Sequence, residues 1–456
     1  MTATPAAPAA NEATSTPTTP AGVGSTASTA SAAPATGGHD GGRARRLPLV
    51  LRNRAFGTVW LGQVLTQAAV RMFQVGVSWW LVAYAVDSGR GLASGLFMAV
   101  STLPAVALAP VVARAVARTA HRSVLRTAAA LAGAAAGALA GWAQLSELPL
   151  AAVYAAALAL ATCQAFFDPC LTTSVPELVD DADIETATGF ELSTQSIAGL
   201  GGALLGAVIV DRAGVSGLAA GCAAAYVGAA LLIAGTRFRT TAAAPAAGDQ
   251  GEPGEPGGAG VTERRTLRRI LGELPYVRRI LICFTAANLF TTAVFVVIPL
   301  YTRSVLGDGG STVALLEAAL GTGTLIGSVT GARVPGRPTV TGAYCLGLMA
   351  LALALPGLVA DRLVVAGGLA VAGWCVGVIG VRFVALFQRL VPAADKPGFF
   401  AVMQAVLGAS FPVASLLFGL AGDHLSAQTL CLIQAAGLLP AACALALLGR
   451  SRGGER

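Results

Sequence analysis

Residues 189–199 read GFELSTQSIAG, and residues 398–408 read GFFAVMQAVLG. Gly, Phe, Gln and Gly recur at identical spacing in the two stretches, and each stretch is preceded by a Val-Pro pair, at 175–176 and 391–392. Each also opens the fifth long apolar run of its half of the chain. Because parallel repeats of this type build one class of membrane transporter, the match predicts a chain made of two similar halves.

The composition places these halves in a membrane. Of the 456 residues, 55% are apolar and 12% are charged, whereas a soluble domain carries about 25% charged residues. Most of the surface must therefore face something other than water. The net charge of +7 comes almost wholly from arginine, and the arginines lie between apolar runs. This placement argues against a nucleic-acid-binding surface.

Apolar runs long enough to cross a bilayer recur along the chain, since a spanning helix needs about 20 residues. They predict an all-α integral membrane protein with twelve transmembrane helices in two six-helix pseudo-symmetric bundles. The predicted spans are 56–86, 92–113, 124–145, 149–170, 186–210, 216–235, 279–301, 312–332, 339–360, 363–388, 399–420 and 427–448.

Polar segments divide the chain into five parts. Residues 1–42 are rich in Ala, Thr, Pro and Ser, which predicts a disordered cytoplasmic tail, and they contain no apolar run typical of a signal peptide. We expect the first bundle over 43–235, a cytoplasmic linker over 236–278, the second bundle over 279–449 and a short basic cytoplasmic tail over 450–456.

Arginine placement supports this count, because loops on the cytoplasmic side of a membrane protein are rich in basic residues. With the N-terminus inside, the outer loops hold only Arg90, Arg212, Arg303 and Arg362. The inner segments hold Arg114, Arg118, Arg122, Arg126, Arg264, Arg265, Arg268, Arg269, Arg278 and Arg279. We therefore predict a monomeric, multi-pass protein of the cell membrane with both termini in the cytoplasm.

Three strings resemble a known family: FGTVWLGQVLTQ (56–67), FFDPCLTTSVPELV (166–179) and FQRLVPAADKPGFFAVMQ (387–404). They are similar to parts of the major facilitator superfamily, in its branch of drug, macrolide and siderophore exporters. The resemblance implies a secondary active transporter that exports a small organic molecule, such as an antibiotic, natural product or siderophore, by alternating access with proton antiport. Such exporters confer multidrug resistance. The alternatives are an importer or symporter of a small metabolite, and a non-transporting receptor or intramembrane enzyme.

The chain departs from the family pattern in three places. Helix 5 has an exporter-like Gly-rich run, GLGGALLG (199–206), but lacks the family's usual proline. The loop ARAVARTAHR (113–122) keeps Arg118 and Arg122, but Ala117 stands where the family has an aspartate. Helix 1 carries Val70 and then Arg71 where the family has an acidic residue. A proton-coupling carboxylate must therefore lie elsewhere.

Arg71 is the candidate substrate-binding residue. It lies near the middle of the first span, where a charge costs roughly 3 kcal/mol on insertion scales. Gln63, Gln67, Gln74 and Ser78 share its helix face by i, i+3 and i+4 spacing, so the five residues predict one polar stripe. The resemblance implies that the first helix of each half lines a central cavity, where Arg71 would attract an anionic group. The alternative is a charge pair inside the first bundle.

Carboxylates and inner arginines supply the other candidates. Arginine does not titrate in proteins, so we expect Glu191 and Glu317 to couple protons. Asp168, at the inner end of helix 4, is expected to pair with Arg118 or Arg122 and lock an inner gate.

The second half and the remaining polar residues complete the predicted site. Arg382 is the fourth gating candidate, with snorkelling and substrate contact as alternatives. Asn288, Thr292 and Gln164 are expected to contact substrate, although back-bonding or interhelical hydrogen bonds are open alternatives. We predict no catalytic residue, metal ion or cofactor, and the small-molecule substrate, protons and the lipid bilayer as partners.

Overall fold

The structure is a computed structural model of the full chain, and it describes residues 49–180, 183–236, 275–392 and 396–451. The predicted tail at 1–42 and nearly all of the predicted linker lie outside these ranges. A few helical side chains within the ranges are also outside the description, and Glu191 is one of them.

Regular structure in the described ranges is helical throughout. The elements are α2 (Leu49–Arg52), α3 (Arg54–Trp80), η1 (Leu81–Ala85), α4 (Arg90–Ala107), α5 (Ala109–Arg118), α6 (His121–Leu145), α7 (Leu150–Leu178), α8 (Ile184–Gly235), α10 (Pro275–Thr292), α11 (Val294–Tyr301), η3 (Thr302–Leu306), α12 (Gly310–Thr330), η4 (Gly331–Arg333), α13 (Pro338–Leu358), α14 (Arg362–Leu390), α15 (Lys396–Gly422) and α16 (Ala427–Ser451).

Ten helices in the described part of the chain are long and apolar enough to cross a membrane. One of them, within α8, is two helices joined at Gly214, whose φ of 66° is left-handed and bends the chain. A further long helix, α3, has 27 residues, and its glutamines and Arg71 lower its apolar character. The bend and α3 bring the count to the twelve predicted spans, and the all-α fold class is confirmed.

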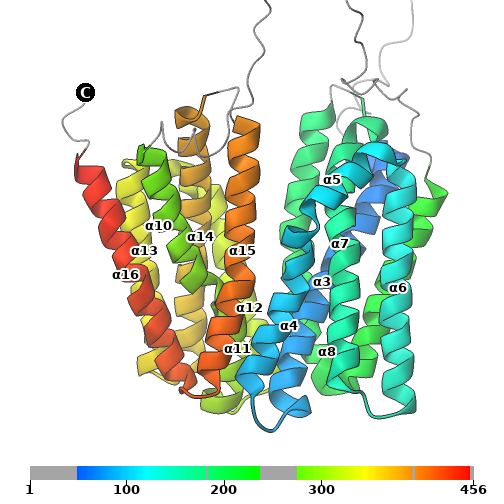
Figure 1. Cartoon of the computed structure of the whole chain (residues 1–456), viewed down its shortest axis with the longest axis horizontal. Helices are drawn as coiled ribbons and strands as arrows, with labels where there is room; N and C mark the ends of the chain where they lie inside the picture. Colours follow the sequence, from blue (N-terminus) through cyan, green and yellow to red (C-terminus); the bar gives the residue numbers. More distant parts are fainter. Residues whose placement is uncertain (1–48, 181–182, 237–274, 393–395, 452–456) are drawn as a thin grey trace, which may run out of the picture. The chain divides into compact units, whose positions relative to one another are not determined.

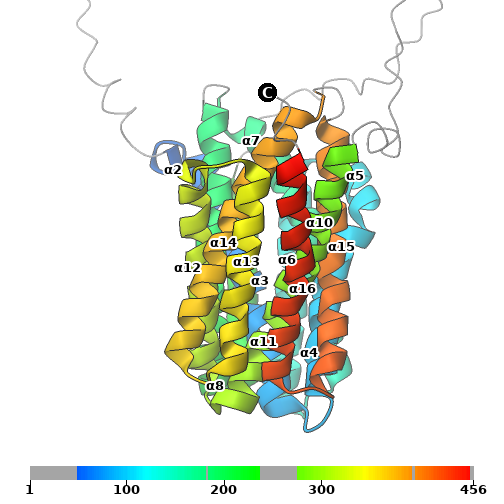
Figure 2. The same cartoon turned by 90° about the vertical axis from the view of Figure 1, so that its left-hand side faces the viewer.

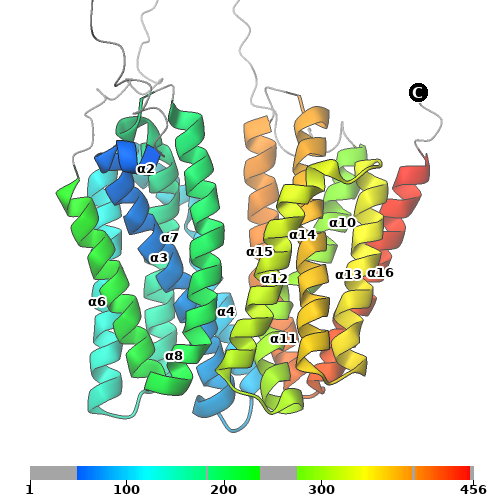
Figure 3. The same cartoon turned by 180° about the vertical axis from the view of Figure 1, so that it is seen from behind.

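The helices form two bundles, α3–α8 and α10–α16 (Figures 1 and 3). In the first, α8 packs against α3 and α6, while α7 packs against α4 and α6. In the second, α12 packs against α14, and α13 packs against α14 and α16. Figure 2 faces the second bundle and shows α13 and α16 side by side.

Two predicted helix boundaries differ from those of the structure, one because of a distant contact and one because of a proline. We expected the fourth span to end at 170, but α7 continues to Leu178. Its last turn is held because Asn53, the N-cap of α3, donates to the carbonyl of Leu178 at 2.8 Å. We expected a continuous helix over 92–113, but α4 ends at Ala107 and α5 starts at Ala109. Pro110 explains this break, because a proline ring clashes with the carbonyl four residues earlier.

The two bundles meet where α4 packs on α15 and where α8 packs on α12. The backbones approach so closely that neither Gly91 nor Gly95 could carry a side chain without meeting the backbone of α15, and Gly310 meets α8 in the same way. We call this contact region the closed end; it comprises Gly91, Gly95, Asp211, Gly310 and Asp423. The glycines of the run 199–206 do not form it, because Gly202 and Gly206 pack against α3 in their own bundle.

Candidate functional site

The side chain of Arg71 leaves the middle of α3 toward the second bundle. Its guanidinium carbon lies 5.8 Å from the ring centre of Phe295 on α11, within the range of a cation–π contact. Its stem runs beside Gly199 of α8, since a Cβ there would stand 3.6 Å from Arg71 Cγ. Arg71 is exposed at this place, so it lies in a seam between the bundles.

Glu317 approaches the same seam from α12. Its side chain is 7% exposed, and it stands one turn before Gly321, which packs against Leu200, the neighbour of Gly199. Glu317 and Arg71, both described, are not in ion-pair contact. The seam therefore contains one positive and one negative group from opposite bundles.

The predicted polar stripe on α3 is accessible only in its middle. Gln63 and Ser78, at its two ends, are 2% and 0% exposed, and Ser78 Oγ is 2.7 Å from Ser94 Oγ on α4. Gln67 and Gln74 are half-buried, and Arg71 is exposed. The ends of the stripe therefore hold helices together, while at its centre Arg71 faces the second bundle and Gln67 and Gln74 face the inside of the first.

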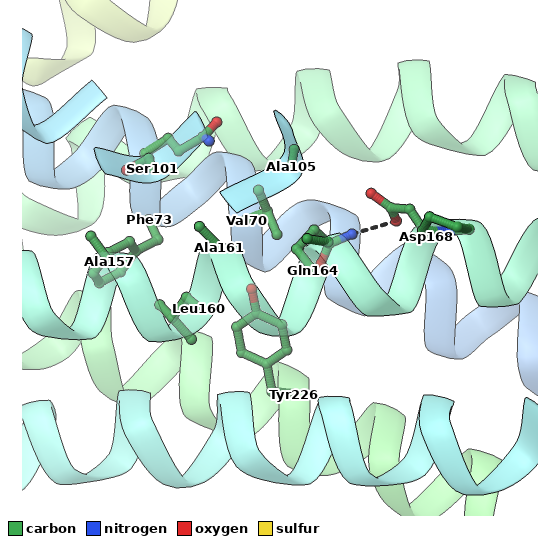
Figure 4. Close-up of a pocket in the computed structure, with 13 residues that line it drawn as sticks. Val70, Phe73, Ser101, Ala105, Ala157, Leu160, Ala161, Gln164, Asp168 and Tyr226 are labelled. Carbon is green, nitrogen blue, oxygen red and sulfur yellow. Dashed lines mark hydrogen bonds between the residues drawn. The ribbon is translucent and has the colours of Figure 1, made fainter. Parts of the chain in front are cut away.

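Three predicted residues form one hydrogen-bonded cluster inside the first bundle. Asp168 Oδ1 accepts from the side-chain amides of Gln67, at 2.8 Å, and Gln164, at 2.5 Å. Asp168 and Gln164 line a cavity of about 200 Å³ between α3, α4, α7 and α8, and Gln74 lines it as well (Figure 4). The sequence singled out these side chains separately, and the fold brings them together.

Two hydroxyl groups of the same cavity were missed in the sequence. The Tyr226 hydroxyl and Ser101 Oγ are buried without a hydrogen-bond partner among the described residues, and both residues line the cavity. Tyr226 itself is 2% exposed. Nothing in the sequence distinguishes Tyr226 from a packing aromatic residue, because only the fold shows that its hydroxyl lies at a cavity.

The second bundle gives its predicted site residues structural partners. Asn288 donates to the carbonyl of Leu407, at 3.2 Å, and to Ser410 Oγ, at 2.6 Å, both on α15. Thr292 Oγ1 donates back to the carbonyl of Asn288 at 2.8 Å. The bonds of Asn288 are the interhelical hydrogen bonds, and the bond of Thr292 is the back-bonding, that were the alternatives to substrate contact.

The arginines expected at an inner gate bind backbone carbonyls within their own bundles. Arg122 donates to the carbonyl of Ala234, and Arg382 donates to the carbonyl of Gly336. Arg118 is exposed at the end of α5. The ion pairs found among the described residues do not include the expected pairing of Asp168 with Arg118 or Arg122, and the gating role of Asp168 stays a prediction.

The ion pairs found among the described residues, near the arginine-rich end, lie within the first bundle. His121 Nδ1 is 2.6 Å from Glu177 Oε1, and Arg52 pairs with Asp183. They tie α6 to the extended end of α7, and α2 to the start of α8. These contacts brace one bundle and do not cross to the other.

The closed end has a polar arrangement that the sequence did not reveal. Asp423, after α15, accepts from the backbone N–H groups of Gly91, at 2.8 Å, and Leu92, at 3.1 Å, in the first turn of α4. Asp211, on α8, accepts from the backbone N–H of Gly310, at 2.5 Å, in the first turn of α12. Each bundle thus caps the N-terminus of a helix of the other, where unpaired N–H groups and the helix dipole favour a carboxylate.

Asp211 is also fixed from its own side. Its Oδ1 accepts from Trp79 Nε1 at 2.6 Å and from the Tyr84 hydroxyl at 2.8 Å. Both donors belong to the first bundle, so Asp211 is positioned by one bundle while it caps the other. Among the described residues, no group of three or more His, Cys, Asp or Glu side chains is placed to hold a metal ion.

A chain of two similar helical bundles in a membrane has the architecture of many transporters built from repeats. Residues 59–380 match the sequence profile of the Major Facilitator Superfamily, and the chain belongs to this family. A comparison with curated proteins finds no significant match.

Solved structures of transporters share the fold at low sequence identity. A bacterial homologue of the human lysosomal transporter Spinster, inward-facing and unoccupied, has a TM-score of 0.67 and 12% identity, over 87% of this chain and 97% of that chain. A bacterial homologue of the iron transporter ferroportin, inward-facing, has a TM-score of 0.65 and 13% identity, over 87% of this chain and 98% of that chain. A D-xylose–proton symporter has a TM-score of 0.64 and 13% identity, over 86% of this chain and 96% of that chain.

Proposed function

We propose that this transporter exports a small organic molecule bearing an anionic group, in exchange for protons. Transport itself follows from the family. The similar structures include a sugar symporter and a homologue of an iron transporter, so the shared fold does not choose a substrate. The observation that carries the choice is the position of Arg71, a permanent positive charge at the middle of a spanning helix that faces the other bundle.

Alternating access fits the distribution of contacts between the bundles. The closed end holds cross-bundle caps and glycine contacts, whereas the ion pairs at the arginine-rich end stay within the first bundle. Arg114 and Arg118 lie on α5, at the far end of the α4–α5 segment from Gly91. If the arginine-rich end is cytoplasmic, as basic residues favour, the present arrangement is inward-facing and the closed end is the outer gate.

Glu317 is our candidate for the coupling group. It is the buried carboxylate of the seam, and intramembrane carboxylates mark proton pathways in transporters. Glu191 remains a second candidate, and its side chain lies outside the described residues.

The test uses proteoliposomes with an imposed proton gradient and radiolabelled aromatic compounds of matched size, bearing a carboxylate, an amine or no charge. We expect gradient-dependent flux of a carboxylate-bearing compound, its loss in Arg71→Ala, and partial retention in Arg71→Lys. Arg212→Ala, which removes an arginine from an exposed position, is the matched control and should behave as wild type. Unchanged flux in Arg71→Ala would remove Arg71 from the site.

The coupling step has its own readout. In Glu317→Gln we expect counterflow, the exchange of labelled for unlabelled substrate without a gradient, to persist while gradient-driven accumulation is lost. Accumulation that continues in this variant, or in wild type after addition of an uncoupler, would contradict proton coupling through Glu317.

A further inference from the structure

The cavity inside the first bundle is long, narrow and different at its two ends. Its α7 wall runs from Ala157 to Asp168, a separation of about 16 Å at 1.5 Å per residue. Asp168 and Gln164 lie toward one end and Ala157 and Phe73 toward the other (Figure 4). The cavity thus has an acidic end at Asp168 and a mainly apolar end, where Ser101 lies beside Phe73 (Figure 4).

The electrostatic character of the lining favours a cation. The thirteen lining residues, all in the described part of the chain, include Asp168 and no basic side chain. Gln67 and Gln164 use amide N–H groups on Asp168, and such charge-assisted bonds fix the carboxylate in place. A negative group at membrane depth attracts a positive partner, and it would repel an anion.

The unpartnered hydroxyls indicate a ligand that donates hydrogen bonds. A buried hydroxyl without a partner is costly, and the Tyr226 hydroxyl faces the cavity beside Ala161 and Gln164 (Figure 4). The Asp168 carboxylate and the Gln164 amide oxygen accept, and a hydroxyl can accept as well as donate, whereas an ammonium group has three donors and no acceptor. The acceptors at the acidic end therefore match an ammonium group.

The cavity is too large and its lining too apolar to suit a bare metal cation. A water molecule occupies about 30 Å³ of liquid, so a cavity of about 200 Å³ is much larger than a single ion requires. Phe73, Leu160 and Val70 offer an ion no ligands, but they suit a hydrocarbon or aromatic group. Ala105 and Pro169 on the wall are exposed, so the cavity is not sealed.

We propose that this cavity is a binding pocket for a protonated amine attached to a short apolar body. The ammonium group donates to Asp168 and the Tyr226 hydroxyl, and the body lies along Phe73 and Leu160. This pocket is distinct from the seam, because Val70 and Gln74 of α3 line it while Arg71, between them in sequence, faces Phe295. The proposal is independent of the direction and coupling of transport.

The experiment measures binding of tritiated phenethylamine to the purified full-length protein in detergent, in choline chloride buffer, with 2-phenylethanol as the uncharged competitor. We expect saturable binding that 2-phenylethanol does not displace. Asp168→Asn should weaken it by at least about 100-fold, since it leaves a buried charge without its partner. Tyr226→Phe should weaken it about 10-fold, as loss of one bond to a charged group.

A second readout protects the test against misfolding. Because the Tyr226 hydroxyl has no hydrogen-bond partner among the described residues, Tyr226→Phe should raise the melting temperature without ligand while reducing the increase that phenethylamine causes. Tyr344→Phe is the matched control, since Tyr344 is 76% exposed on α13 of the other bundle, and it should change neither quantity.

Three results would overturn the proposal. They are no saturable phenethylamine binding to wild type, wild-type affinity in Asp168→Asn or Tyr226→Phe, and displacement of phenethylamine by 2-phenylethanol at equal concentration. Stabilisation by sodium chloride that depends on Asp168, without amine binding, would show an inorganic cation site instead. Because no flux is measured, failure here leaves the proposed transport function untouched.

Discussion

Neutralising Asp423 should open the closed end. The carboxylate accepts from two backbone N–H groups of α4, at 2.8 and 3.1 Å, across the boundary between the bundles. In Asp423→Asn one acceptor oxygen becomes a donor, and the charge at the helix N-terminus is lost. Capping and dipole terms together are worth about 1–2 kcal/mol at an exposed site. The equilibrium between closed and open should therefore shift about 5- to 30-fold toward open.

Hydrogen exchange of the backbone amides measures this shift directly. The amides of Gly91 and Leu92 are the donors to Asp423, so they are protected only while the bundles touch. When closing is faster than exchange, their rate scales with the open population. We expect mass spectrometry of peptides covering residues 86–98 to show exchange faster by that factor in Asp423→Asn. The double variant with Asp211→Asn should show a larger factor.

Asp361→Asn is the matched control. Asp361 also caps a helix, accepting from Leu363 N at 2.9 Å and Val364 N at 3.0 Å, but these donors belong to α14 in its own bundle. It should speed exchange around residues 361–366 and leave 86–98 unchanged. The reasoning fails if Asp361→Asn opens 86–98 as much as Asp423→Asn does, or if the double variant exchanges like wild type.

Three further outcomes follow from the contacts. Gly95→Val places a side chain against the backbone of Ser415 on α15, so the same peptides should exchange faster than in Gly141→Val, whose site has nothing within 4 Å. Asn53→Ala removes the cap of α3 and its bond to Leu178, and should cost about 1–2 kcal/mol, seen as a lower melting temperature. Arg122 donates from its guanidinium to the carbonyl of Ala234. Lysine keeps the charge but not the guanidinium geometry, so Arg122→Lys should lower the melting temperature, and Arg122→Ala, which removes charge and donor, should lower it more.

The fold could be predicted because lipid imposes strong rules on sequence. A spanning helix must satisfy its own backbone and expose apolar side chains, so each crossing is visible as a long apolar run. The boundaries were wrong where the chain leaves the apolar region. The end of α7 is set by Asn53, more than a hundred residues away in sequence, and no local pattern in 171–178 reports that contact.

The candidate site was predictable only in its unusual residues. Arg71 stood out because a charge is rare at that depth, and the structure places it against Phe295 in the seam. Tyr226 and Ser101 did not stand out, because both are ordinary in a membrane helix and their importance depends on lacking a partner. Whether Arg71 binds substrate and Glu317 carries protons remain predictions for the flux experiments above.

The two caps at the closed end show how the internal repeat is used. The register that aligns Phe190 with Phe399 places Leu420 opposite Asp211, so Asp423 stands about one helical turn further along. Even so, each aspartate comes from the end of the fifth helix of its half and caps the second helix of the other half. The halves therefore share a contact and not a sequence position. A comparison of repeats by residue type alone misses such a pair, whereas a search for acidic residues near both fifth-helix ends, facing glycines at second-helix starts, would find it.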